Sequence, residues 1–426
     1  MSEHTRVPSA TSPVTSRLGL DATRVKRDFP ALERIVNGHL ITYLDSAASS
    51  QRPWAVLKAM DRYYETTHAN VHRGVYTTAV EATERYEGAR SIFARFVNAC
   101  STNEIIFTKN VTEALNLVAQ SWGNANVHAG DVIVYTEMEH HANLVPWQML
   151  AARTGAVLRY VPVTDDGHLD LSNLDALLDG AKVFAFTAAS NVLGTINPVR
   201  QLADAAHRAG AIAVCDAAQL APHMTMDVQA MGVDFAGITG HKMCGPTGVG
   251  VLWGRESLLD AMPPFLGGGD MINDVRIDGF TPNELPWKFE AGTPPIAEVI
   301  GLGAACDYLS GLVLDDVRAH EVDLTGYAMN VLEARFGDRL KIHGPRDPNA
   351  RTGVLSLALE GVHPHDISQV LDQQGVCVRA GHHCAKPLMR RLGVGATARA
   401  SFYVYNERRD VDTLAEALSS ASDFFK

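Results

Sequence analysis

A carboxylate and a lysine follow two apolar segments and could serve one cofactor. Asp216 comes after residues 211–215, and His241-Lys242 closely follows residues 234–239. Both segments are typical of buried parallel strands, and ligands of an open α/β sheet lie outside the carboxyl ends of such strands. A lysine there can link to an aldehyde cofactor, while a carboxylate keeps a pyridine nitrogen protonated so that the ring accepts electrons. This pattern predicts a pyridoxal phosphate enzyme.

A third element of the sequence fits the phosphate of such a cofactor. Thr112 begins a helical pattern directly after the strand-like residues 104–108, and helix N-termini bind phosphate through their backbone N–H groups. Taken singly, Thr112 and Asp216 would be ordinary helix caps and Lys242 a solvated surface residue. Their joint occurrence, in this order, favours the cofactor site.

Cys384 indicates which reaction the cofactor serves. It lies in a polar segment with two histidines before it and Lys386 after it, a setting that favours the thiolate. The other five cysteines occur in apolar surroundings or on predicted elements, where an inert buried thiol is the usual state. Arg399 follows on a strand, and its planar guanidinium suits the carboxylate of an amino acid.

Two pairs of neighbouring histidines invite a metal-binding interpretation, which we reject. They are His140-His141 and His382-His383. Adjacent side chains point to opposite faces of a strand, or about 100° apart on a helix, so such pairs seldom share one ion. A flat ring placed near a pyridine cofactor is an equally good use for His140. We therefore expect no metal.

The composition excludes several classes of protein. The chain has 426 residues and a formal net charge of −11, with no basic run, which argues against nucleic acid or an anionic membrane surface as partner. The longest uncharged stretch, residues 183–199, is interrupted by Asn, Gly and Pro and is not a membrane span. Six cysteines are too few for a disulfide framework, so we expect a cytoplasmic protein.

The patterns predict an α/β architecture with two folded domains. Residues 1–20 are rich in Ser, Thr and Pro and are expected to form a disordered tail. Strand-like and helix-like segments then alternate, which favours a mostly parallel sheet. We place a large cofactor-binding domain at 21–290, with 21–35 packing on the small domain, and an α+β domain at 291–426. Residues 263–295 are expected to form a long loop, and 398–405 a strand.

An ordered series of motifs resembles the group II (SufS-type) cysteine desulfurases, also known as selenocysteine lyases, of the class V aminotransferase family. The likeness covers about residues 25–426. Its motifs are Leu44-Asp45-Ser46-Ala47-Ala48, Asn70-Val71-His72-Arg73-Gly74, Thr112-Glu113, Glu139-His140-His141-Ala142-Asn143, Ser190-Asn191-Val192-Leu193-Gly194, Asp216-Ala217-Ala218-Gln219, Gly240-His241-Lys242, Gly245-Pro246-Thr247-Gly248, Phe289-Glu290-Ala291-Gly292-Thr293, Arg379-x-Gly-His-His-Cys384 and Arg399-Ala400-Ser401.

The resemblance implies a fold-type I pyridoxal phosphate enzyme, with a mostly parallel seven-stranded sheet in its large domain and a smaller C-terminal α+β domain. It implies that Lys242 is the Schiff-base lysine, that Asp216 contacts the pyridine nitrogen and that His140 stacks on the ring. It further assigns the ring hydroxyl to Asn191 and Gln219, and the phosphate to Thr112, Thr239, His241 and, from the other subunit of a homodimer, Thr293. The substrate would be bound by Arg399, Arg379, Asn191 and His72. One departure is Val111, where relatives often have a hydroxyl residue.

The implied reaction converts L-cysteine to L-alanine and leaves a persulfide on Cys384, with Lys242 and His140 moving protons. L-selenocysteine is a second expected substrate. The sulfur would pass to a SufE-like or SufU-like acceptor and to scaffold proteins of iron–sulfur cluster assembly. Two alternatives remain open. One is a class V aminotransferase or lyase that does not use Cys384, and the other is a non-catalytic subunit of the assembly machinery.

Overall fold

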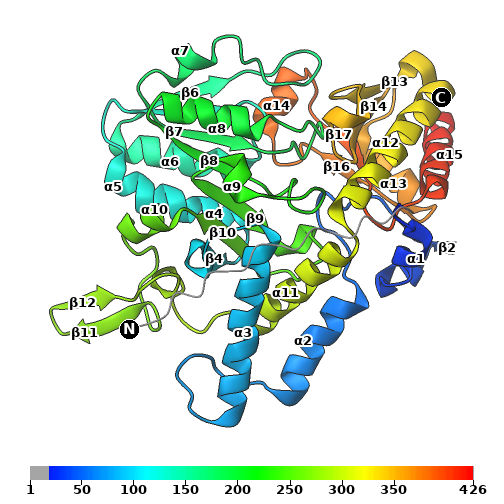
Figure 1. Ribbon diagram of the computed structural model, residues 1–426. Coiled ribbons are helices and arrows are strands. Elements are labelled where there is room, and N and C mark those ends of the chain that lie inside the picture. Colours follow the sequence, from blue (N-terminus) through cyan, green and yellow to red (C-terminus); the bar gives the residue numbers. More distant parts are fainter. Residues whose placement is uncertain (1–18, 426) are drawn as a thin grey trace.

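The computed structural model describes residues 19–425, so nearly all of the expected tail at 1–20 lies outside the described residues. Figure 1 shows a central sheet with helices on both sides and a second, smaller group of strands and helices beside it. Within the described residues, no single helix is long and apolar enough to cross a membrane. One pair of consecutive helical segments, Ile296–Gly311 and Leu314–Arg339, reaches the required length and apolar character together, but the two are bent by 73°.

The central sheet has seven strands in the order β4-β10-β9-β8-β7-β5-β6. All neighbouring pairs are parallel except those of β10, which runs antiparallel to both β4 and β9. This confirms the predicted α/β fold with a mostly parallel seven-stranded sheet. The strands are β4 (Ile105–Thr108), β5 (Val132–Thr136), β6 (Val157–Val161), β7 (Ala181–Thr187), β8 (Ile212–Asp216), β9 (Phe235–Thr239) and β10 (Gly250–Gly254).

Both faces of this sheet are buried under helices, which explains why its strands are continuously apolar. Side chains alternate between the faces: Phe184 and Phe186 of β7 join one core, while Val183 and Ala185 join another. The first face is covered by α3 (Thr77–Phe96) and α8 (Val199–Arg208), and the second by α4 (Val111–Val118) and α6 (Val145–Thr154). Further helices are α1 (Ala22–Lys26), α2 (Trp54–Thr66), α5 (Asn124–Asn126), α7 (Leu174–Leu178), α9 (Val228–Met231), α10 (Glu256–Ala261) and α11 (Ile296–Gly311).

The second sheet is antiparallel and has the strand order β13-β14-β17-β16. A separate apolar core joins it to helices α12, α13 and α15. The strands are β13 (Leu340–His343), β14 (Val354–Leu359), β16 (Arg379–Gly381) and β17 (Thr397–Ser401); the helices are α12 (Leu314–Phe336), α13 (Pro364–Asp372), α14 (Lys386–Arg391) and α15 (Arg408–Phe424). In the N-terminal segment, β1 (Ile35–Val36) and β2 (His39–Leu40) form a local hairpin. The parallel pair of β3 (Thr42–Tyr43) with β15 (Val376–Cys377) links this segment to the small domain.

Two local expectations differ from the structure. The segment 263–295 contains a two-stranded hairpin, β11 (Ile272–Arg276) with β12 (Gly279–Pro282), that projects from the molecule in Figure 1. The strand expected at 398–405 ends at Ser401, because Asn406 accepts a hydrogen bond from the backbone of Tyr403 and turns the chain. Residues 402–405 are apolar because they are buried, not because they pair with a strand.

The N-terminal segment ties the two halves together. Lys26 on α1 binds Asp410 on α15, with 3.0 Å between Nζ and Oδ1. Phe29 packs edge-on against Tyr405 and Tyr308, which bring the small domain and α11 against it. Helix α11 in turn packs along α2 and α3. The segment 21–35 thus contacts both halves, with Val25, Phe29 and Leu32 in the core of the large sheet, and its assignment to the small domain stays a prediction.

A buried arginine fixes the segment that leads from the hairpin to α11. Both terminal nitrogens of Arg90 donate to the Glu290 carboxylate at 2.7 and 2.8 Å, and Nη1 also donates to the carbonyl of Ile105. The Glu290 carboxylate also accepts hydrogen bonds from the N–H of Phe107 and the hydroxyl of Tyr86. Removing the arginine would leave a carboxylate buried without its cation, which is far more costly than losing an exposed pair.

We predict that Arg90→Met lowers the free energy of unfolding by about 3–5 kcal/mol. Arg200→Met is the matched control, because Arg200 pairs with Asp204 on an exposed helix face and such pairs contribute under about 0.5 kcal/mol. Denaturant unfolding of both variants measures the difference. Equal losses for the two variants would contradict the assigned role of the buried pair.

Candidate active site at the carboxyl edge of the sheet

Five parallel strands deliver the predicted cofactor-binding residues to one edge of the sheet. The carboxyl ends of parallel strands meet there, which makes this edge the usual ligand site of such folds. The residues that follow the strands are Thr112 after β4, His140 after β5, Asn191 after β7, Asp216 at the end of β8, and Thr239-Gly240-His241-Lys242 at the end of β9.

Asp216 and Lys242 lie close enough to influence each other's ionisation. Burial raises the pKa of Asp216, while the N–H of Ala218 at 3.0 Å and the charge of Lys242 oppose that rise. Burial likewise lowers the pKa of Lys242 to about 8, against the attraction of Asp216. A buried carboxylate with little compensation is suited to a cationic partner, such as a protonated pyridine nitrogen, and a lysine with a lowered pKa is suited to act as a nucleophile.

His140 is a neutral imidazole with a defined tautomer. Its Nδ1 accepts a hydrogen bond from the N–H of Ala142 at 3.0 Å, so the proton is on Nε2. Burial lowers the pKa of His140 to about 3, and the charges of Lys242, His141 and Arg399 add to the effect. Its ring therefore stays uncharged at physiological pH and can lie against a flat cofactor while Nε2 donates.

A buried acid that sequence reasoning missed positions this histidine. Glu139 accepts hydrogen bonds from Asn143 at 2.7 Å and from the N–H of Thr187 on β7 at 2.8 Å, which fastens the loop after β5 to its neighbour. Burial raises its pKa to about 8, and the charge of Asp216 contributes. Glu139 is the first residue of the quoted Glu-His-His-Ala-Asn motif, so the sequence did draw attention to this segment. The sequence does not show, however, that the carboxyl is buried.

Two buried polar atoms at this edge have no hydrogen-bond partner within the described residues. They are Oε1 of Gln219 and Oγ1 of Thr239. Gln219 already donates from Nε2 to the carbonyl of Ala47 at 2.7 Å, which leaves Oε1 directed to accept. Buried polar groups of folded proteins are normally satisfied, so these atoms are explained by a bound group that carries a hydroxyl and an anion. Both features belong to pyridoxal phosphate.

The phosphate end of the site is built from β9 and the start of α4. Val111 is buried, and its Cγ2 would lie only 2.8 Å from a Cβ added to Gly237, so α4 begins directly against β9. The buried Val111 side chain faces the sheet, while Thr112 beside it is exposed at the helix start. His241 lies near Ser49 (3.4 Å from Nδ1 to Oγ), and burial lowers its pKa to about 4.

The loop that carries Cys384 is held in a strained conformation. His383 and Cys384 have φ values of 50° and 54°, and left-handed backbone costs a non-glycine residue about 1–2 kcal/mol. Hydrogen bonds from the large domain offset this cost: His141 N–H donates to the carbonyl of Cys384 at 2.7 Å, and Asn191 Nδ2 donates to that of His383 at 2.7 Å. The Cys384 residue itself is exposed.

The expected substrate-binding arginines are joined by a carboxylate that the sequence analysis did not single out. Arg399 is buried and donates to the carbonyl of Asn191 at 2.9 Å and to Asp45 at 3.0 Å. Arg379 donates to the other oxygen of Asp45 at 3.2 Å. Asn191 links Arg399 to the Cys384 loop, because its carbonyl accepts from that arginine and its Nδ2 donates to the carbonyl of His383.

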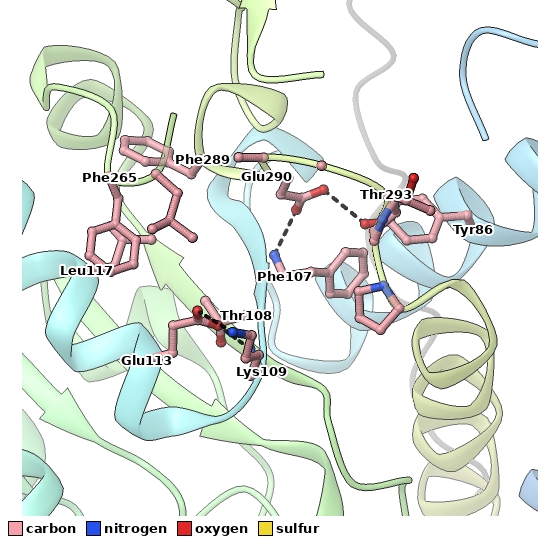
Figure 2. Close-up of a pocket in the computed structure, with 15 residues that line it drawn as sticks. Tyr86, Phe107, Thr108, Lys109, Glu113, Leu117, Phe265, Phe289, Glu290 and Thr293 are labelled. Atoms are coloured by element: carbon pink, nitrogen blue, oxygen red, sulfur yellow. Dashed lines mark hydrogen bonds and ion pairs between the residues drawn. The ribbon is translucent and has the colours of Figure 1, made fainter. Parts of the chain in front are cut away.

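His72 and Thr293 lie in a different part of the chain. His72 binds Glu87 at 2.8 Å and packs edge-on against Tyr86 and Trp287. Thr293 lines a cavity of about 140 Å³, and Figure 2 shows it beside Tyr86, with Lys109 and Glu113 at the start of α4. Their roles in binding substrate and phosphate stay predictions.

Comparison with known proteins shows the family to which this chain is similar. Residues 42–414 match the model of the family described as Aminotransferase class-V. A Streptomyces coelicolor protein named "Probable cysteine desulfurase" is 52% identical over 413 residues, covering 95% of this chain and 98% of the relative. A Haloferax volcanii protein named "Cysteine desulfurase" is 46% identical over 420 residues, covering 95% and 98%. The apo structure of a cysteine desulfurase from Thermococcus onnurineus NA1 has 40% identity and a TM-score of 0.91, covering 96% of this chain and 100% of that one.

The chain belongs to the class V aminotransferase family, and its cofactor is pyridoxal phosphate. Lys242, Asp216, Gln219 and Thr239 form the part of the site that fits this group. Within the family, the chain is an enzyme of the cysteine desulfurase type. The predicted family, fold, cofactor and enzyme class are thereby confirmed.

The lowered pKa of Lys242 predicts how the cofactor-free protein reacts with pyridoxal phosphate. Only the neutral amine attacks an aldehyde, and with a pKa of about 8 about a tenth of it is neutral at pH 7. The rate of covalent attachment should therefore rise with pH and level off above about pH 8. Stopped-flow absorbance measures this rate, with Lys242→Ala as the blank and Nα-acetyl-lysine as the reference that keeps rising. If the rate for the protein keeps rising above pH 8 as the rate for Nα-acetyl-lysine does, the lowered pKa of Lys242 is refuted.

Proposed function

We propose that this enzyme removes the sulfur of L-cysteine, releases L-alanine and carries the sulfur as a persulfide on Cys384. The observation that supports this most is the shared site: Asn191 donates to the carbonyl of His383, beside Cys384, and accepts from Arg399 with its own carbonyl. An aminotransferase that did not use Cys384 would have no need of an exposed thiol held there by a strained loop.

Arg399 and Arg379 orient the substrate through its carboxylate. Arg399 is buried and its Nε has no partner within the described residues, so it has donors left for a ligand. Asn191 holds the same region from both sides, accepting from Arg399 with its carbonyl and donating to the Cys384 loop with Nδ2. A carboxylate bound there places the amino acid between the lysine and the cysteine.

Lys242 moves the first proton. Pyridoxal phosphate, when bound, withdraws electrons from the carbon that loses this proton. The Nζ of Lys242 takes the proton from Cα, which its pKa of about 8 permits near neutral pH. Asp216 would support this by keeping the pyridine nitrogen of the cofactor protonated. His140 donates a hydrogen bond from Nε2, because its Nδ1 already accepts one.

The sulfur transfer balances without a further reagent. The Cys384 thiolate attacks the substrate sulfur and forms a sulfur–sulfur bond, while the bond from that sulfur to Cβ breaks. The electron pair of the broken bond stays with Cβ, which takes up one proton in place of the proton released when Cys384 ionised. Lys242 returns to Cα the proton that it removed, so the former cysteine leaves as alanine. The enzyme gains one sulfur atom, and the thiol becomes a persulfide.

Cys384→Ser tests this role. Cofactor absorbance and cysteine binding should persist, because Lys242 and Arg399 are unchanged. Alanine release should fall by about a hundredfold or more, the scale seen when a group that takes part in the chemistry is removed. Cys377→Ser is the matched control, a thiol in the same domain. Normal alanine formation by the Cys384 variant would favour the lyase alternative.

A homodimer would complete the site. Thr293 is exposed in its own chain, beside a cavity that also contains Glu113 from the start of α4. The region of Thr112 and that of Thr293 therefore lie on neighbouring parts of one surface. Two copies packed through this surface would bring Thr293 of one chain to the phosphate site of the other. Equilibrium sedimentation of the holoenzyme tests this association.

We propose that the enzyme supplies sulfur for iron–sulfur cluster assembly. We place it in the cytoplasm, because the six cysteines of the described chain are free and thiols persist in that reducing compartment. L-selenocysteine is a second substrate on chemical grounds, because selenium is attacked and released at least as readily as sulfur. The collecting protein would be of the SufE-like or SufU-like class, delivering to an iron–sulfur scaffold.

Sulfur should leave Cys384 slowly without such an acceptor. The backbone of the loop is fixed at Cys384 and His383 by the large domain, and Lys386 N–H donates to His141 Nε2 at 3.1 Å. The thiol therefore cannot swing out to a distant partner. We predict that a docked acceptor accelerates alanine formation at limiting reductant, because docking raises the effective concentration of its thiol. Titration of SufE-like and SufU-like proteins measures this. Fast turnover with reductant alone would contradict a restrained loop.

A further inference from the structure

Asp45 occupies a position between two arginines that face each other. Arg379 on β16 and Arg399 on β17 are direct partners in the antiparallel register. Like charges directly opposite each other on neighbouring strands repel. One oxygen of Asp45 lies 3.0 Å from Nη2 of Arg399, and the other lies 3.2 Å from Nε of Arg379. A single carboxylate thus offsets the repulsion of the pair.

The backbone holds Asp45 firmly in this place. It follows β3 and forms a parallel bridge with Ser401, two residues beyond Arg399. The N–H of Leu44 donates to the carbonyl of Cys377 at 2.9 Å, and the N–H of Ser401 donates to that of Leu44 at 2.8 Å. Asp45 is therefore held between the backbones of Cys377 and Ser401, next to the point where β16 and β17 pair. These strands lie in the small domain seen at the right of Figure 1.

Partial burial strengthens the electrostatic interaction of the Asp45 carboxylate with the two arginines. The side chains of Asp45 and Arg399 are 16% and 3% exposed, whereas that of Arg379 is 51% exposed. Burial lowers the pKa of Arg399 and the charge of Arg379 adds to this, while Asp45 raises it. Interactions between charges are stronger in such a partly buried site than in water.

The charges leave room for one carboxylate of a ligand. Two guanidinium groups and the carboxylate of Asp45 sum to a charge of +1. Arg399 keeps an unpartnered Nε, so an α-carboxylate can bind without displacing Asp45. A second carboxylate on the same ligand would enter a site whose positive charge is already matched, and it would be repelled by Asp45.

We propose that Asp45 is a positioning residue with a role in specificity. It orients Arg399 and Arg379, and its charge makes the site favour amino acids with an uncharged side chain over those with an anionic one. The inference rests on the proposed binding of the substrate carboxylate by the two arginines.

Asp45→Asn in the holoenzyme tests the inference, because it keeps the shape of the side chain and removes its charge. The probes are L-alanine and L-aspartate as competitive inhibitors of L-cysteine turnover. We expect the ratio of the inhibition constant of aspartate to that of alanine to fall by about tenfold, since one repulsive charge interaction is lost. The KM for L-cysteine should rise severalfold and kcat should stay within about twofold, because only ligand orientation changes. An unchanged ratio would overturn the proposal.

Asp45→Glu separates charge from position and serves if the asparagine variant does not fold. It should keep the wild-type inhibitor ratio, because the charge remains, yet raise KM, because the longer side chain displaces the arginines. A ratio that falls as far as in Asp45→Asn would refute the charge argument.

Two controls make the failures distinguishable. Asp234→Asn removes a carboxylate that pairs with Arg255 at 2.9 Å at the opposite end of β9, and it should alter neither the ratio nor KM. Arg399→Ala tests the underlying assignment. If that variant binds cysteine normally, the carboxylate site itself is wrongly placed. If it loses cysteine while Asp45→Asn keeps the wild-type inhibitor ratio, only the role of Asp45 fails.

Discussion

The parallel alignment of strands is the constraint on which the site depends. Each strand end must leave the sheet at the same edge, and what emerges there is a carboxylate at β8 and a lysine at β9. Asp216 is buried and Lys242 is half-buried, and each perturbs the pKa of the other. Such a pair, costly in an empty protein, is well suited to a cofactor that has a cationic nitrogen at one position and an aldehyde at another.

The Cys384 thiol is placed by hydrogen bonds that its loop accepts from the large domain. Its loop leaves the small sheet in a left-handed conformation that an isolated loop would avoid. His141 and Asn191, both following strands of the large sheet, donate the hydrogen bonds that hold it. Displacement of one domain relative to the other would break these bonds and shift the thiol at the same time. Sulfur chemistry is therefore linked to domain packing.

Much of this could be predicted from the sequence, and the reasons are physical. Continuous apolar runs ending in Asp216 or in His241-Lys242 indicate buried parallel strands, and the motif order indicates one sheet edge. Prediction from the sequence failed where the local residue pattern did not match the structure that the surrounding protein imposes. Residues 402–405 are as apolar as a strand but are buried in a turn, and the hairpin β11–β12 lies in a segment whose prolines and glycines are typical of a loop.

Glu139 and Asp45 show what sequence patterns could not reveal about the site. Both are acidic residues within quoted motifs, and both have partners far away in the chain: Thr187 for one, in addition to nearby Asn143, and Arg379 and Arg399 for the other. A carboxylate is recognised as structural or functional by the cations and donors around it, which depend on register and burial. In β16 and β17 the register sets two arginines opposite each other, and that arrangement alone requires an anion between them. The need for Asp45 thus follows from strand pairing, which no local motif encodes.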